Sequence, residues 1–136
     1  MNLLYIAHPY EGKKENAEAV QKIVEALAEW EHPLLAEKRP EDTVHIYAAG
    51  EILEMQALDV AQAVPVSPIH QFGFMYDSVP YAVGLQKCLA LLNACDVLLL
   101  CGDWRNSKGC MAEFAYAIAK GKPILFEHEG DCYELL

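Results

Sequence analysis

The chain alternates between short, nearly continuous apolar runs and longer stretches in which apolar residues recur every three or four positions. Uninterrupted apolar runs are typical of strands that are buried on both faces of a parallel sheet. The three-to-four spacing predicts amphipathic helices between them. Strands are expected at residues 2–7, 43–48, 64–66, 96–101 and 123–126, and helices at residues 15–30, 50–63, 83–94 and 110–120.

This order of elements predicts an α/β fold with a mostly parallel, five-stranded sheet and helices on both faces. A length of 136 residues fits a single domain that spans the whole chain. Residues 34–42 are rich in charge and contain Pro40, which favours a surface loop. Gly121 is placed to cap the last helix.

Three of the predicted loops come at the carboxyl ends of strands, namely residues 8–14, 67–82 and 102–109. Parallel sheets bind ligands in the crevice at these ends, where the strand order reverses. The middle loop is too long and too aromatic for a plain connection, and loops of that kind often line a site. We therefore expect a ligand crevice that is bordered by the three loops.

The third loop ends in Ser107, Lys108 and Gly109, just before a predicted helix. Free backbone N–H groups, a hydroxyl and a cation at a helix start suit an anion such as a phosphate. Ser107 could equally serve as the helix N-cap, and the two roles are compatible. Glu113 is expected in the first turn of this helix, where a carboxylate often only complements the helix dipole. Its apolar sequence neighbours instead favour a buried carboxylate that faces the crevice.

The other two loops supply further candidates for binding. Tyr5 could place its hydroxyl at the crevice floor or be a core tyrosine, and His70 is a candidate acid or base. The loops lack GxxxxGK[ST] and GxGxxG, so nucleoside triphosphate hydrolysis and a nicotinamide cofactor are not expected, and no cofactor or metal is inferred. The candidate binding residues are His8, Pro9, Tyr10, Gly12, His70, Asp103, Trp104, Ser107, Lys108 and Gly109.

Charge and cysteine content narrow the choice of partners. A net charge of −10 argues against nucleic-acid polymers and anionic membranes, although a small phosphate site stays open. Five cysteines without a CxxC pair predict free, largely buried thiols rather than a disulfide framework or a zinc site. No signal peptide or membrane-length apolar run is recognised, which favours the cytoplasm.

Three segments in series, residues 5–12, 95–100 and 104–117, resemble the nucleoside 2-deoxyribosyltransferase-like superfamily. The likeness is closest to its small uncharacterised branch from bacteria and phages. It implies a flavodoxin-like or Rossmann-like three-layer fold, with residues 34–63 as an insertion, and a homodimer or larger homo-oligomer. It also implies cleavage or exchange of the N-glycosidic bond of a nucleoside or its 5′-monophosphate. Glu113 would attack C1′ as the nucleophile, with Tyr5 beside it and Ser107 at the phosphate.

The sequence departs from the family pattern at two positions. Cys88 stands where the family has an acid, eight residues before Asp96, and Glu11 stands where its nucleotide hydrolases have an arginine. His70 or Asp103 could replace the missing acid. The leading hypothesis is an enzyme, the alternative is a module that senses a nucleotide without turning it over, and the third is a structural or interaction protein.

Overall fold

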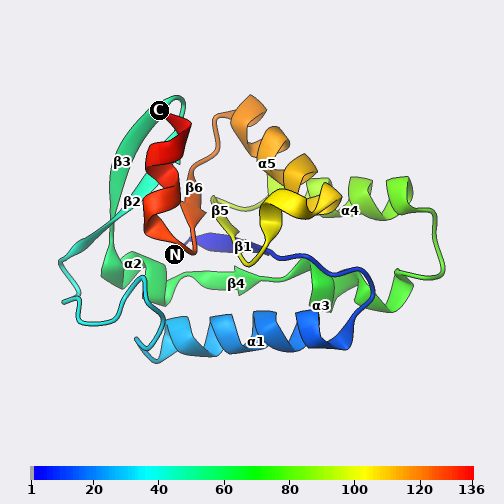
Figure 1. Cartoon of the computed structure of the whole chain (residues 1–136), viewed down its shortest axis with the longest axis horizontal. Coiled ribbons are helices and arrows are strands. Elements are labelled where there is room, and N and C mark those ends of the chain that lie inside the picture. The colour runs from blue at the N-terminus through cyan, green and yellow to red at the C-terminus, as the bar shows by residue number, and fades with distance from the viewer. Residues whose placement is uncertain (1) are drawn as a thin grey trace.

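The apolar runs of the sequence become the strands of one sheet in the computed structural model, which describes residues 2–136. The fold is α/β, with a six-stranded mixed sheet and helices on both faces (Figure 1). The strands are β1 (Leu3–Ala7), β2 (Thr43–Ala48), β3 (Glu51–Gln56), β4 (Val64–Val66), β5 (Val97–Leu100) and β6 (Ile124–Phe126). The α-helices are α1 (Lys14–Ala28), α2 (Ala57–Gln62), α3 (Pro68–Phe72), α4 (Tyr81–Asn93) and α5 (Lys108–Lys120). Three 3-10 helices complete the list: η1 (Gly73–Met75), η2 (Trp104–Asn106) and η3 (Glu129–Leu135).

The strand order is β3-β2-β6-β5-β1-β4. β1 pairs in parallel with β4 on one side and with β5 on the other, and β5 pairs in parallel with β6. β2 runs antiparallel to β6 and extends the sheet through an antiparallel hairpin with β3. β1 is thus the point at which the chain turns from one side of the parallel part to the other.

The prediction of a helix over residues 50–63, and with it the count of five strands, was wrong. Residues Glu51–Gln56 form β3, and only Ala57–Gln62 are helical. Ala49 and Gly50 both have positive φ (51° and 82°), as the two-residue turns of tight hairpins require. β3 lies at the sheet edge and is mostly exposed, so it lacks a buried face and the alternation that would mark it. Its Leu, Met, Glu and Gln residues also favour helices intrinsically.

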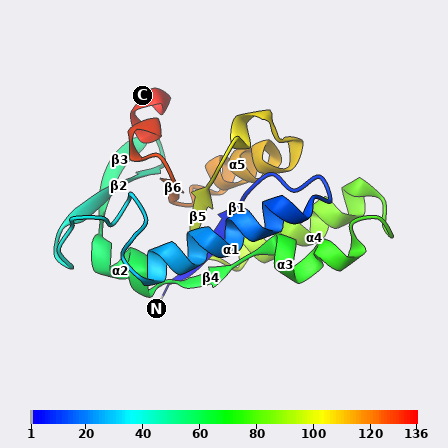
Figure 2. The same cartoon turned by 60° about the horizontal axis from the view of Figure 1, so that its bottom comes forward.

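Alternation along β1 separates the two layers of the core. Leu4 and Ile6 pack on the side of α1, α2 and α3, whereas Tyr5 and Ala7 pack on the side of α4 and α5. Figure 2 shows α1 lying across its face of the sheet, with α5 on the opposite side. Tyr5 therefore points toward the layer that contains Glu113.

Residues 34–42 are not simply a surface loop, because Leu34 and Leu35 are buried in the core beside α1. The charged residues that follow these two leucines made the whole stretch look like a surface loop in the sequence. Gly121 does cap α5, in the left-handed conformation at φ 66°. Within residues 2–136, no helix combines the length and the apolar character that a membrane crossing needs.

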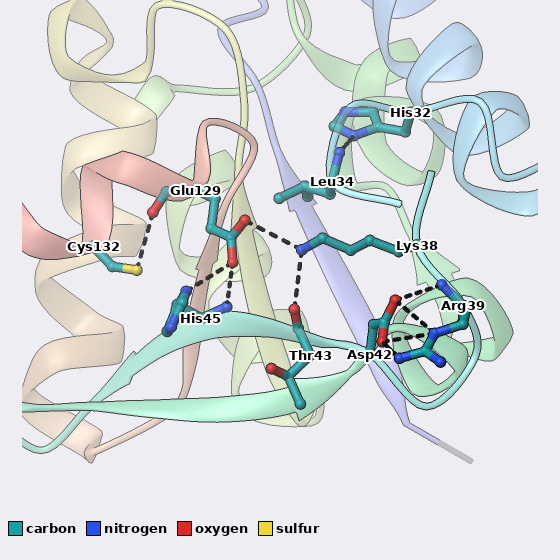
Figure 3. Close-up of polar contacts among 9 residues, drawn as sticks. All are labelled: His32, Leu34, Lys38, Arg39, Asp42, Thr43, His45, Glu129 and Cys132. Atoms are coloured by element: carbon teal, nitrogen blue, oxygen red, sulfur yellow. Dashed lines mark hydrogen bonds and ion pairs between the residues drawn. The ribbon is translucent and has the colours of Figure 1, made fainter. Parts of the chain in front are cut away.

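Glu129 fastens the C-terminal segment η3 to the rest of the fold (Figure 3). Its carboxylate accepts hydrogen bonds from the backbone N–H of His45 at 2.8 Å, from Nδ1 of His45 at 2.9 Å and from Nζ of Lys38 at 3.3 Å. Lys38 also donates to the carbonyl of Thr43 at 3.0 Å. One carboxylate thus ties η3 to β2 and to the segment before it.

Candidate functional site

A cavity of about 700 Å³ opens at the carboxyl ends of β1, β4 and β5, where the strand order reverses. The three segments expected from the sequence border it, and α4 and α5 complete the wall. The expectation of a loop over residues 67–82 was wrong in part, because this segment contains α3, η1 and the start of α4. Its lining is mostly apolar and aromatic, with few charged groups. The residues that line it are His8, Tyr10, Glu11, Pro68, Ile69, Phe72, Gly73, Met75, Tyr76, Val79, Pro80, Tyr81, Gly84, Leu85, Cys88, Asn106, Ser107, Lys108, Gly109, Cys110 and Glu113.

Glu113 is the buried acid of this cavity, with 6% of its surface exposed. Because α5 begins at Lys108 rather than at Cys110, Glu113 lies in the second turn of the helix and not in the first. Its Oε2 has no hydrogen-bond partner among residues 2–136. Burial raises the pKa of this carboxyl to about 7, and the nearby Tyr5 hydroxyl offsets part of the rise. The group therefore exchanges its proton near neutral pH.

Tyr5 lies beneath the cavity in β1 and is fully buried. Its hydroxyl, like Oε2 of Glu113, has no hydrogen-bond partner within the described chain. Burial, and then the charge of Glu113, raises its pKa far above the ordinary value. The Tyr5 hydroxyl is close enough to lower the pKa of Glu113, yet neither group makes a well-formed hydrogen bond, which is uncommon for buried polar atoms. Such a pair is ready to receive polar atoms of a ligand.

Three further groups surround Glu113 closely enough to feel its charge. Burial and Glu113 raise the pKa of the Cys88 thiol to about 11, and Tyr5 lowers it in part. Burial raises the pKa of Cys110 to about 12, partly offset by Ser107. Burial and Glu113 also raise the pKa of Tyr81. All three groups keep their protons at neutral pH and leave Glu113 as the group that titrates there.

The start of α5 forms the polar end of the cavity. Oγ of Ser107 accepts a hydrogen bond from the backbone N–H of Cys110 at 3.2 Å, so Ser107 does act as the N-cap. Its hydroxyl proton is still available to a ligand, so the binding role is not excluded. Lys108 is exposed and makes no ion pair within residues 2–136. Gly109 leaves room for Tyr81, whose hydroxyl would lie 3.2 Å from a Cβ at that position.

The loop after β1 is held in shape by contacts of its own. Nδ1 of His8 donates to the carbonyl of Pro9 at 2.7 Å, which leaves Nε2 beside Gly102. The ring of Tyr10 meets that of Tyr76 edge to face, with centroids 5.1 Å apart. Gly12, at φ 71°, lies under the Tyr76 ring, which is 3.1 Å from where a Cβ would be. Pro9 and Gly12 shape the loop without lining the cavity.

Three other candidates from the sequence also lie off the cavity. His70 is exposed on α3 and binds the hydroxyl of Ser67 at 2.8 Å. Asp103 accepts from the side-chain amide of Asn106 at 2.9 Å. Trp104 is buried against Phe114 and Phe126. Neither His70 nor Asp103 replaces the acid at Cys88, because neither lines the cavity.

The cations that could have joined a phosphate site are mostly engaged elsewhere. Arg105 stacks on Trp104 and pairs with Glu134 at 2.6 Å and Asp131 at 3.5 Å. Lys13 pairs with Glu11 at 3.0 Å. Lys108 is thus the one Lys or Arg among the cavity-lining residues.

One face of α4 belongs to the cavity wall, and of its residues only Gly84 and Leu85 were not singled out from the sequence. Tyr81, Gly84, Leu85 and Cys88 line the cavity together, at the spacing i, i+3, i+4 and i+7 that marks a single helix face. The spacing is visible in the sequence, but the helix was expected to begin at residue 83 rather than at Tyr81.

Glu127, directly after β6, was also missed. It accepts from the N–H of Gly102 at 3.0 Å and from Nε2 of the buried His32 at 3.1 Å, and so holds the loop on which His8 rests. Its position directly after a predicted strand, at the carboxyl end where a ligand crevice was expected, could have marked Glu127 as a candidate.

Within residues 2–136, no group of three or more His, Cys, Asp or Glu residues could hold a metal ion. All five cysteines are free. Residues 73–126, from η1 to β6, match the sequence profile of a domain of unknown function, DUF4406. A comparison with curated proteins finds no match, and neither does a comparison with solved structures.

Proposed function

We propose that this protein cleaves, or transfers the sugar across, the N-glycosidic bond of a nucleoside or nucleoside 5′-monophosphate, with Glu113 as the nucleophile. The observation that carries the proposal is the orphaned, buried carboxyl of Glu113 at a cavity large enough for a nucleoside. The resemblance of three sequence segments to the nucleoside 2-deoxyribosyltransferase-like superfamily supports it. The placement of β1 between β4 and β5 accords with the flavodoxin-like or Rossmann-like fold of that superfamily.

The chemistry follows from a carboxylate in a partly apolar site. One oxygen of ionised Glu113 attacks C1′, and the base leaves with the electron pair of the glycosidic bond. Tyr5, which lies close enough to lower the pKa of Glu113, would donate a hydrogen bond to the carboxylate once it ionises. Water or a second base then attacks C1′ and frees the carboxylate. Ser107, Lys108 and the N–H groups at the start of α5 would hold the 5′ end of the sugar.

Release of free base tests the proposal. The chain is incubated with a panel of ribo- and deoxyribonucleosides and their 5′-monophosphates, and base release is followed by chromatography. We expect release from at least one substrate and a fall of roughly 1,000-fold or more in Glu113→Gln, which keeps the shape but cannot attack. Glu54→Gln, at an exposed position of the edge strand β3 at the other end of the sheet, is the matched control and should keep full activity. No release from any substrate, or equal release by Glu113→Gln, would overturn the proposal.

A sensing module is the second candidate, and Cys88 favours it. The thiol at the position of the expected acid, with a pKa of about 11, is a weak proton donor for a departing base. A sensor would be stabilised by a nucleotide in a thermal-shift assay without consuming it. Stabilisation with no base release, by the wild-type chain and by Glu113→Gln alike, would decide for sensing.

The compartment, the assembly and the ligand of the protein are part of the same proposal. We expect a cytoplasmic protein that assembles as a homodimer or larger, with a small nucleoside or nucleotide as its ligand. α4 supports the assembly, because Leu92 is its one buried residue while Tyr81 and Val83 are exposed. Phe74, at the neighbouring η1, is 81% exposed. Exposed apolar side chains of this size are common at interfaces between protein chains.

A further inference from the structure

Building on the N-glycosidic chemistry proposed above, we infer that the cavity takes nucleosides whose base carries a positive charge, such as N-alkylated purines or pyridinium ribosides. Three features of the site lead to this substrate class: an orphaned acid, an aromatic wall and the lack of a ready proton donor.

The acid lacks a counter-charge of its own. Oε2 of Glu113 is unpartnered, and the groups that face Glu113 are the neutral side chains of Tyr5, Tyr81, Cys88 and Cys110. Lys108 lies five residues earlier in α5, roughly 7 Å away along the helix axis. A cationic ring bound beside Glu113 would supply the missing charge and favour the ionised, nucleophilic form.

The walls of the cavity suit a flat cation. Tyr10, Phe72, Tyr76 and Tyr81 line it, and the edge-to-face packing of Tyr10 on Tyr76 fixes two of these rings. The faces of aromatic rings attract cations through their quadrupole. Glu11 also lines the cavity, but Lys13 pairs with its carboxylate at 3.0 Å, so Glu113 is the acid that is left to meet the cation.

The leaving group gives the third reason. A neutral base needs a proton as it departs, yet Tyr5 and Cys88 hold their protons at neutral pH. Nδ1 of His8 is committed to the carbonyl of Pro9, and its Nε2 faces Gly102. A cationic base needs no proton, because the electron pair of the broken bond neutralises its ring.

The reaction balances without a general acid. A carboxylate oxygen of Glu113 forms a bond to C1′, the C1′–N bond breaks, and its electron pair cancels the positive charge of the base. Water then attacks C1′, its oxygen becomes the C1′ hydroxyl and its proton goes to solvent. The carboxylate is regenerated, and one neutral base, one sugar and one proton are released.

Guanosine and 7-methylguanosine form a matched pair for the test, since a single methyl group makes the base a cation. Base release and binding are measured for both with the wild-type chain and with Glu113→Gln, after correction for spontaneous hydrolysis. We expect kcat/KM and affinity to favour 7-methylguanosine by about tenfold or more, and the preference in affinity to shrink severalfold in Glu113→Gln, which keeps the aromatic wall but lacks the carboxylate.

Calorimetry of the wild-type chain in two buffers of different ionisation heat gives a readout that needs no variant. At pH 6, where 7-methylguanosine keeps its positive charge and Glu113 is mostly protonated, binding of the cation should release the proton of Glu113 to the buffer, whereas guanosine should release none.

The outcomes separate this inference from the proposed function. Equal base release and equal binding of the two nucleosides would overturn the inference and leave the N-glycosidic function standing. Preferred binding of 7-methylguanosine through Glu113, without base release, would support cation recognition and count against turnover. Neither release nor preferred binding would overturn both.

Discussion

Among single residues, Glu113 matters most, and its chemistry depends on how it is buried. The carboxyl lies in the apolar layer between α4 and α5, with Tyr5 below it and Cys88 beside it. Burial of a carboxylate without a partner is unfavourable, so the folded chain prefers the protonated form. A residue placed in this way weakens the fold at neutral pH, which is typical of functional sites.

This burial predicts how stability depends on pH. The pKa of Glu113 is raised from 4.5 to about 7 in the folded chain, so the folded state holds the proton more tightly than the unfolded state. Stability from this group is complete below about pH 4.5 and is lost as pH rises to about 7. Urea unfolding should show Glu113→Gln gaining up to about 3 kcal/mol over wild type near pH 8, and close to nothing near pH 4. A constant difference across this range would contradict the burial of an unpaired carboxyl.

Ser107 offers a second test at this scale. Because its hydroxyl caps α5, Ser107→Ala should lower the free energy of unfolding by about 1 kcal/mol. Ser107→Asp keeps a capping oxygen and should restore that stability, while its negative charge should weaken binding of a 5′-monophosphate but not of the nucleoside. Equal loss of both ligands in Ser107→Asp would show that the residue only shapes the helix.

The sequence predicted the burial of Glu113 but not the positions of several other candidate residues. The apolar neighbours of Glu113 pointed to burial, whereas its place in the second turn could not be read because helix starts are poorly marked. His70 and Asp103 looked like acids for the site, but local partners, Ser67 and Asn106, draw their side chains away. Hydrogen bonds of this short range leave no periodic signal in a sequence.

At the scale of elements, buried strands were predictable and the edge strand was not. β1 and β5 are apolar because both of their faces are covered, which is visible in the residues themselves. β3 is held by its register with β2 and by the turn at Ala49 and Gly50, so its identity depends on a partner strand. The 3-10 segment η3 likewise depends on Glu129 and its long-range bonds to His45 and Lys38.

Gly50 tests the hairpin. Its φ of 82° disfavours any side chain, while no atom lies within 4 Å of a Cβ there. Gly50→Ala should therefore destabilise the chain by about 1 kcal/mol through backbone strain alone, as measured by urea unfolding. Gly84→Ala is the control: it lies in α4 with ordinary backbone angles and a first contact at 3.9 Å, so it should stabilise by about 0.5–1 kcal/mol. If residues 50–63 formed a helix instead, Gly50→Ala would raise the free energy of unfolding rather than lower it.

At the scale of the whole molecule, the topology places the site. β1 lies between β4 and β5 in the sheet. Between β4 and β5 in the sequence, the chain passes from α3 on one face of the sheet to α4 on the other (Figure 1). The loops at that reversal meet around one cavity. The order of strands and helices in the sequence indicated the position of this cavity. Ligands bind at the carboxyl ends of parallel strands where the strand order reverses, and this rule depends on how strands are connected rather than on particular residues.

Phe74 on η1 and Val83 on α4 are apolar and exposed, and they predict that the chain assembles with copies of itself. We expect a dimer or larger species in analytical ultracentrifugation, since these side chains are apolar and exposed at α4 and η1. Replacing Phe74 and Val83 by glutamate should yield a monomer, because burying the new charges would be unfavourable. Leu136→Glu, at another exposed apolar residue distant in the sequence, should leave the mass unchanged. A monomeric wild-type chain would contradict this prediction.

The most direct test of the central claim is to trap the sugar on Glu113. A nucleoside with fluorine at the 2′ position slows both steps of a carboxylate-dependent mechanism, so that the glycosyl ester accumulates. Mass spectrometry of the quenched and digested protein should find one added fluorosugar on the peptide that contains Glu113, together with one equivalent of free base. Base release with the sugar on another residue, or with no adduct on the protein at all, would contradict the account.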